Sequence, residues 1–140
     1  MRRIHNDPVG DDLHRLVTAI NEICFNTELA RIPIYYMAAD SGTVCLYDRG
    51  DILVDKAYYS VNGISNNLIH GIFHTMVHAY CDQKGIQDTD GDRHLEAFAD
   101  ECDRHGGYCS WNNSQYGYNL TGVKVKKMKR IKKDMEQKGA

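Results

Sequence analysis

The sequence predicts a single α+β domain, in which a helix, a small sheet and further helices follow one another along the chain. Its 140 residues are of single-domain size. Hydrophobic residues make up 42% and charged residues 26%, as in an ordinary globular protein. Segments with helical periodicity and segments rich in β-branched or aromatic residues succeed one another without a repeat or a low-complexity linker. We therefore expect one folded domain over residues 1–122 and a helical tail over residues 123–140.

The first helix is expected within residues 13–30. Asp11 and Asp12 precede it, and acidic side chains stabilise the first turn of a helix. Pro33 marks the break after it. The apolar residues that recur at helical spacing are Leu13, Leu16, Val17, Ile20, Ile23 and Cys24.

Three strands are expected next, because the segments 32–38, 43–48 and 51–61 are rich in β-branched and aromatic residues. The turn-forming stretches "ADSG" and "DRG" separate them. Short strands with tight connections favour a small antiparallel three-stranded sheet in meander order.

Two more helices follow the sheet. One is predicted over residues 68–84, with Ser65 or Asn66 as its N-cap and Gly85 as its terminating glycine. The other is predicted over residues 93–104. The aromatic-rich segment 108–120 is expected to be irregular or extended.

The tail is predicted to form a basic helix. Residues 121–140 carry eight Lys or Arg and two acidic residues, a charge of +6; since the whole chain carries −2, residues 1–120 carry −8. Val125, Met128, Ile131 and Met135 form one apolar stripe, which predicts that this helix docks on the body while its lysines stay in solvent.

Composition excludes several classes of protein. No apolar run approaches the ~20 residues of a membrane span. The N-terminal stretch "MRRIHNDPVGDD" has no apolar segment behind its arginines, so a secretory signal is not predicted and an intracellular location is expected. Five cysteines without a CxxC pair predict partly buried free thiols.

The segment "FHTMVHAY", residues 73–80, places two histidines on one face of the second predicted helix. Residues four apart have Cβ atoms ~5–6 Å apart, so His74 and His78 can reach one metal ion. His70 continues this row, but a straight helix rarely directs three turns at one ion. His94, at the expected start of the next helix, could complete the three-ligand set of a catalytic zinc site. His5, His14 and His105 lack such a context and are expected at the surface.

These motifs resemble the SprT-like (Spartan-type) zinc metallopeptidases. "HTMVHAY" followed by "KGIQDTDGDRHLEAFADECDRHGG" is similar to the family's HExxH helix, loop and third histidine, where Phe98 lies four residues after His94. "FNTEL" and "YGYNLTG" extend the resemblance to residues 10–122. The resemblance implies a zincin-like fold, peptide hydrolysis, and Zn²⁺ held by His74, His78 and His94.

Thr75 departs from the family pattern, in which this position holds the glutamate that acts as general base. Threonine does not titrate near neutral pH, and loss of a positioned proton carrier typically costs ~10²–10⁴-fold in rate. We expect a metal-binding fold with weak or absent hydrolysis, in which the Thr75 hydroxyl could contact a metal-bound water. A threonine here is compatible with a natural variant and with a substitution that silences an enzyme.

Other carboxylates could orient the histidine ligands or could be solvated helix charges; they are Asp82, Glu96, Asp100 and Glu101. The resemblance also implies a protein substrate near DNA, which suits a basic tail that contacts phosphates. The candidate DNA-binding residues are Lys124, Lys126, Lys127, Lys129, Arg130, Lys132 and Lys133. Three functions stay open: an impaired metallopeptidase, a non-catalytic zinc-binding module for a protein or nucleic-acid partner, and a domain without metal. The sequence does not predict an oligomeric state.

Overall fold

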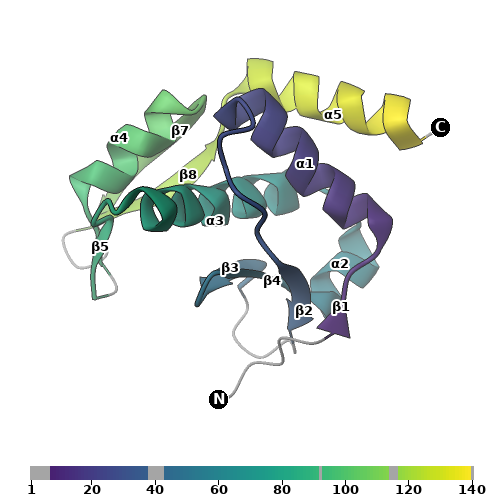
Figure 1. The fold of residues 1–140 in the computed structure, drawn as a ribbon, viewed down its shortest axis with the longest axis horizontal. Helices are drawn as coiled ribbons and strands as arrows, with labels where there is room; N and C mark the ends of the chain where they lie inside the picture. The colour runs from purple at the N-terminus through teal and green to yellow at the C-terminus, as the bar shows by residue number, and fades with distance from the viewer. Residues whose placement is uncertain (1–6, 38–42, 92, 114–116, 140) are drawn as a thin grey trace.

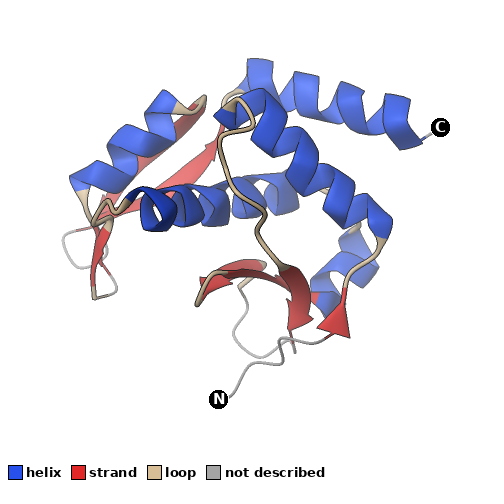
Figure 2. Ribbon diagram, in the orientation of Figure 1, coloured by secondary structure: helices blue, strands red, loops and turns tan. Residues whose placement is uncertain are grey.

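The computed structural model describes residues 7–37, 43–91, 93–113 and 117–139, and in this part the chain is an α+β protein with five helices and two four-stranded sheets (Figures 1 and 2). The elements in chain order are β1 (Asp7–Pro8), α1 (Asp11–Phe25), β2 (Ile34–Met37), β3 (Cys45–Asp48), β4 (Asp51–Asp55), α2 (Lys56–Asn62), α3 (Asn66–Lys84), β5 (Thr89–Asp90), β6 (Arg93–His94), α4 (Glu96–Arg104), β7 (Gly107–Asn113), β8 (Gly117–Val123) and α5 (Val125–Gly139). The helix α3 contacts β3 of one sheet and β8 of the other (Figure 1).

The ends of α3 lie close to where the sequence predicts them. The Ser65 hydroxyl accepts a hydrogen bond from the Leu68 amide at 3.2 Å, which makes Ser65 the N-cap. At the other end Gly85 adopts a left-handed conformation, with φ of 70°, and closes the helix. Between these caps α3 buries ten side chains, so it is the central helix of the core.

The first sheet differs from the predicted antiparallel meander. Its strand order is β1-β2-β4-β3, and β2 pairs with β4 in parallel while β3 pairs with β4 antiparallel. Ile52, Leu53 and Val54 of β4 are fully buried on both faces of the strand. Such a continuous apolar run belongs in the centre of a sheet, which moves β3 to the edge.

The predicted third strand also ends earlier than expected. The Asp55 carboxylate accepts hydrogen bonds from the amides of Ala57 and Tyr58 at 2.9 and 3.2 Å. This N-cap starts α2, so residues 56–62 are helical although their side chains favour a strand.

A glycine allows the edge strand to approach the central helix. A Cβ atom at Gly71 of α3 would lie 3.2 Å from the Cβ atom of Cys45 in β3, tighter than an ordinary contact. Because Gly71 has no side chain, β3 can pack closely against α3. His74 and Thr75 lie one turn further along this helix.

The second sheet contains a long antiparallel hairpin, β7 and β8, and the short strands β5 and β6. The predicted third helix begins only at Glu96, because Arg93 and His94 belong to strand β6. His94 is thus held by strand pairing with Thr89 and Gly117, and not by a helix as the sequence suggested.

The basic tail docks as its apolar stripe predicts. The helix α5 packs against α1, and Met128 and Ile131 are buried while Met135 is partly buried against the same core (Figure 1). Val125 is the exception, since 70% of its surface is exposed. The Lys127 ammonium donates to the Ile23 carbonyl at 2.9 Å, which adds a polar contact between the two helices.

The sequence predicted that His5, His14 and His105 lie at the surface. His14 is exposed, but His105 is buried, so the prediction is wrong for His105. His5 lies outside the described residues. The His105 ring stacks on Phe25 and meets the edge of Tyr80, with ring centroids 4.5 and 4.4 Å apart. Its Nε2 lies 3.5 Å from the carboxylate of buried Glu101. Burial lowers the pKa of His105, although Glu101 favours its charged form. His105 therefore joins the ends of α1, α3 and α4.

Replacing His105 with alanine should lower the free energy of unfolding by about 3 kcal/mol, because it opens a cavity between two rings and leaves Glu101 without its buried partner. Urea denaturation followed by circular dichroism measures this loss. The matched control is His14→Ala, an exposed position that should change stability by less than about 0.5 kcal/mol. Equal effects of the two substitutions would contradict the structural role of His105.

All five cysteines carry free thiols, and four of them are buried. None of the helices in the described ranges has the length and apolar character needed to cross a membrane.

Candidate metal centre

Three histidines that lie apart in the sequence converge on one point. The Nε2 atom of His78 lies 3.1 Å from that of His74 and 3.1 Å from that of His94. One potential ligand atom from each residue lies within 4.8 Å of the others. Two nitrogens bound at ~2.0–2.1 Å to one tetrahedral ion would lie ~3.3–3.4 Å apart, so this spacing fits a shared metal ion. The group could hold a metal through three imidazole nitrogens.

The helix α3 supplies two of these imidazoles because His74 and His78 are one turn apart. The third reaches them through the second sheet. Strand β6 pairs with β5 through His94 and Thr89, and with β8 through His94 and Gly117. A Cβ atom at Gly117 would lie 2.2 Å from the His94 carbonyl oxygen, so only glycine lets β8 come this close.

Phe98 packs against all three imidazoles. Its ring centroid lies 4.9, 4.6 and 4.7 Å from those of His74, His78 and His94. Phe98 is fully buried on α4, so its ring limits the rotation of the three side chains. Phe98 is the apolar residue four positions after His94 that the sequence analysis singled out.

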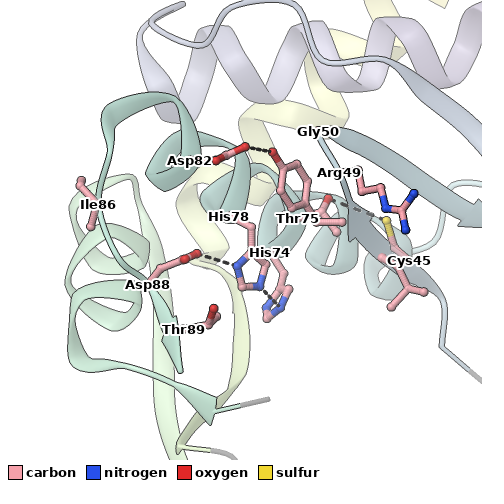
Figure 3. Close-up of a pocket in the computed structure, with 12 residues that line it drawn as sticks. Cys45, Arg49, Gly50, His74, Thr75, His78, Asp82, Ile86, Asp88 and Thr89 are labelled. Atoms are coloured by element: carbon pink, nitrogen blue, oxygen red, sulfur yellow. Dashed lines mark hydrogen bonds and ion pairs between the residues drawn. The ribbon is translucent and has the colours of Figure 1, made fainter. Parts of the chain in front are cut away.

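Hydrogen bonds orient the two histidines of α3. His78 Nδ1 lies 2.7 Å from the Asp88 carboxylate, and His74 Nδ1 lies 2.7 Å from the Thr121 hydroxyl (Figure 3 shows the first contact). Both contacts use Nδ1 and leave Nε2 directed at the shared point. Carboxylate and hydroxyl partners of this kind fix the orientation of metal-binding imidazoles.

His74 is held in the form that binds metal. Burial lowers its pKa well below the usual value, and the neighbouring imidazoles of His78 and His94 lower it further. At neutral pH the ring is therefore uncharged, with a nitrogen lone pair available to a cation.

Replacing Asp88 with asparagine should weaken metal binding by roughly 10–100-fold, the usual cost of losing a carboxylate that orients a histidine ligand. Competition with a chromophoric chelator measures the affinity. Asp82→Asn is the matched control, because Asp82 lines the same cleft but accepts its hydrogen bond from Tyr47, at 2.7 Å. An unchanged affinity in Asp88→Asn would rule out this role.

A cleft of about 470 Å³ opens beside the histidines (Figure 3). The edge strand β3 and the turn after it form one wall, and the end of α3 with the loop to β5 forms another. The lining residues are Cys45, Leu46, Tyr47, Arg49, Gly50, His74, Thr75, His78, Asp82, Ile86, Asp88 and Thr89. Two of the three histidines thus face a space that a ligand can enter.

Thr75 lines this cleft but its hydroxyl is already bonded. The Oγ1 atom donates to the Ile72 carbonyl at 2.7 Å and lies 3.8 Å from the Cys45 sulfur (Figure 3 shows the second contact). Only 1% of Thr75 is exposed. Since its single proton is used within α3, the Thr75 hydroxyl has no proton to offer to a water in the cleft.

Two of the carboxylates considered in the sequence have other partners than the imidazoles of His74, His78 and His94. Asp82 accepts from Tyr47, and buried Glu101 pairs with Arg104 and His105. Glu96 and Asp100 are exposed on α4. The observed partners are Asp88 and Thr121 instead. The loop motif around Asp88 offered a clue. Thr121 lies in the "YGYNLTG" motif, but it is 47 residues from His74 and the motif did not predict their contact.

The remaining candidate residues lie elsewhere. His70 accepts a hydrogen bond at Nδ1 from the Val123 amide, at 2.9 Å, which holds it away from the three-histidine cluster. The seven basic residues considered for DNA binding do not line the cleft. Two of them contact the body: Lys124, just before α5, pairs with Asp103, and Lys127 of α5 donates to the Ile23 carbonyl. The other five are exposed; they are Lys126, Lys129, Arg130, Lys132 and Lys133.

No family model, curated protein or solved structure matches this chain.

Proposed function

We propose that this chain is a zinc-binding domain of the SprT-like metallopeptidase type, with a zincin-like fold and with hydrolysis impaired at Thr75. The convergence of three imidazole nitrogens beside an open cleft is the observation that carries the proposal. The order of elements supports it as well, because a helix with HxxxH is followed by a third histidine from a separate segment.

Zinc is the metal that this donor set favours. Neutral imidazoles suit borderline cations, and catalytic zinc sites commonly combine three protein ligands with one open position. When bound, zinc supplies Lewis acidity toward water and a substrate carbonyl. The residues of the chain hold the site in shape: Asp88 and Thr121 orient two ligands, and Phe98 packs beneath all three.

An extended peptide is the class of ligand that suits the cleft. The strand β3 is the edge of its sheet among the described strands, and it lines the cleft next to His74 and His78. Edge strands present free backbone groups that bind a peptide as an additional strand. A protein substrate or partner would then lie along β3 with its backbone near the three imidazoles.

A second candidate is a non-catalytic zinc-binding module that recognises such a partner. The hydrogen bonds of Asp82 and Asp88, the two carboxylates that line the cleft, favour this second candidate. Asp88 is bonded to His78 and Asp82 to Tyr47, so neither is placed to take a proton from water as the family's glutamate does. The Thr75 proton is bonded to Ile72.

Both candidate functions require that the chain binds zinc, and metal analysis of the purified chain tests this. We expect one zinc ion per chain, and removal by a chelator should lower the melting temperature reversibly. At a free zinc concentration of 100 times Kd, binding adds about 2.7 kcal/mol of stability. A chain that takes up no zinc at micromolar concentrations would contradict both functions.

The exposed basic face of α5 is proposed as a contact for DNA. Five exposed cations on one docked helix form a surface that attracts phosphates. Replacing Lys129 and Arg130 with glutamine should weaken binding of a DNA duplex and reduce its salt dependence, measured by fluorescence anisotropy. Glu136→Gln on the same helix is a control that removes a negative charge. DNA affinity that is equal in both variants would contradict this contact.

A further inference from the structure

Tyr47 joins the edge strand β3 to the helix that carries two of the three histidines. Its hydroxyl donates a hydrogen bond to the Asp82 carboxylate at 2.7 Å, which Figure 3 shows as the dashed line that ends on Asp82. Its ring stacks on the imidazole of His78, with the ring centroids 6.2 Å apart and the two planes inclined by 17°. Tyr47 therefore contacts two successive turns of α3.

The spacing of the strand and of the helix places Tyr47 beside His78. Two residues before Tyr47, the sulfur of Cys45 lies 3.8 Å from the hydroxyl oxygen of Thr75. Side chains two apart on a strand point to the same side and lie ~6.6 Å apart along it. One turn of a helix advances by a similar ~5.4 Å. One step of two residues along β3 therefore matches one turn of α3, which leads from Thr75 to the region of His78.

The imidazole of His78 is held by contacts of three kinds. The Asp88 carboxylate lies 2.7 Å from its Nδ1 atom. The ring of Phe98 packs against it with a centroid distance of 4.6 Å and a tilt of 32°. The ring of Tyr47 adds a nearly parallel contact from the edge strand. Together these groups leave only 14% of the His78 side chain exposed.

We propose that Tyr47 is a positioning residue for the metal ligand His78. This role rests on the proposed zinc site. The hydrogen bond to Asp88 fixes which nitrogen of the imidazole faces the metal, whereas a stacked ring restrains the tilt of the imidazole plane. Offset stacking with centroids ~4.5–7 Å apart is a favourable arrangement of two aromatic rings. The hydrogen bond to Asp82 in turn fixes the ring of Tyr47.

The zinc affinity of full-length variants tests this role. Tyr47→Leu removes the ring and should weaken zinc binding by roughly 10-fold, the lower end of the range for residues that orient a ligand. Tyr47→Phe keeps the ring and loses only the hydrogen bond to Asp82, so its affinity should stay within about 3-fold of the unmodified value. Competition with a chromophoric chelator measures both affinities.

The visible absorption bands of the cobalt(II)-loaded protein provide a second measurement, because they depend on the geometry of the ligands around the ion. We expect these bands to shift in Tyr47→Leu and to be retained in Tyr47→Phe. A change in overall stability alone does not move them. Circular dichroism shows whether each variant is folded. If Tyr47→Leu does not fold, Tyr47→Val removes the ring with a residue that favours a strand.

Tyr58→Leu is the matched control. The hydroxyl of Tyr58 is also hydrogen-bonded, to the Ser65 hydroxyl at 2.7 Å, but Tyr58 does not line the cleft. This variant should keep the zinc affinity and the cobalt spectrum of the unmodified protein.

Unchanged zinc affinity and an unchanged cobalt spectrum in folded Tyr47→Leu would overturn the positioning role. A loss of affinity in Tyr58→Leu or Tyr47→Phe as large as that in Tyr47→Leu would overturn it as well. The zinc site itself is tested separately by the unmodified chain. If that chain takes up no zinc, the proposed function fails; if it binds zinc and Tyr47→Leu binds equally well, only the role of Tyr47 fails.

Discussion

Replacing Thr75 with glutamate is expected to raise the rate of peptide hydrolysis by ~10²–10⁴-fold, the usual contribution of a positioned general base. Thr75 follows His74 directly and lines the cleft, so a longer side chain from this position can extend toward the metal centre. Its carboxylate would accept a proton from the attacking water and deliver it to the leaving amine. The Thr75 hydroxyl serves neither step, because its proton is bonded to the Ile72 carbonyl.

A zinc-loaded protein assayed on an unfolded protein substrate measures this change. Thr75→Gln is the matched control, because glutamine has the length of glutamate without a titrating carboxylate. Both variants must bury part of a larger side chain next to Cys45, so their melting temperatures are compared first. Hydrolysis that appears only in Thr75→Glu supports an impaired peptidase. Its absence from folded, zinc-loaded Thr75→Glu favours the non-catalytic module.

Replacing His94 with alanine is expected to weaken zinc binding by more than ~100-fold, because it removes one of the three proposed ligands. Loss of a residue that only orients a ligand costs up to ~100-fold. His94 Nε2 lies 3.1 Å from that of His78, and no other strand residue contributes to the three-histidine group in the described part of the chain. Metal content and chelator competition both report the loss.

His70→Ala is the control for this substitution. His70 lies one turn before His74 on α3, but its Nδ1 accepts a hydrogen bond from the Val123 amide. The variant should lose about 1 kcal/mol of stability and keep its zinc affinity. If His94→Ala kept its zinc affinity and His70→Ala lost it, the third ligand would be His70 instead.

The helices α3 and α5 were predictable because their determinants are local. Ser65 and Gly85 mark the ends of α3 through cap geometry that depends on a few adjacent residues. The stripe of Met128 and Ile131 predicts the buried face of α5, since apolar side chains three or four apart share one side of a helix. Val125 lies in the first turn of α5 and stays exposed.

The order of strands was predicted wrongly because strand pairing is not a local property. Tight turns suggested that each strand pairs with the next one, yet β2 pairs with β4 in parallel and β3 is at the edge. The full burial of Ile52, Leu53 and Val54 explains this order, because both faces of a central strand are covered. The position of β3 at the edge of the sheet, along the cleft, follows from this order.

The sequence by itself determined which imidazoles of α3 share a face, because a four-residue spacing on a helix places His74 and His78 in one row. It also determined that no glutamate follows His74. Only the tertiary structure decided how His94 joins them, through a strand that requires Gly117, and which side chains orient the rings. Asp88 comes from the loop after α3 and Thr121 from β8, 10 and 47 residues from their histidines. Contacts at such separations depend on the packing of the whole chain, which local periodicity does not specify.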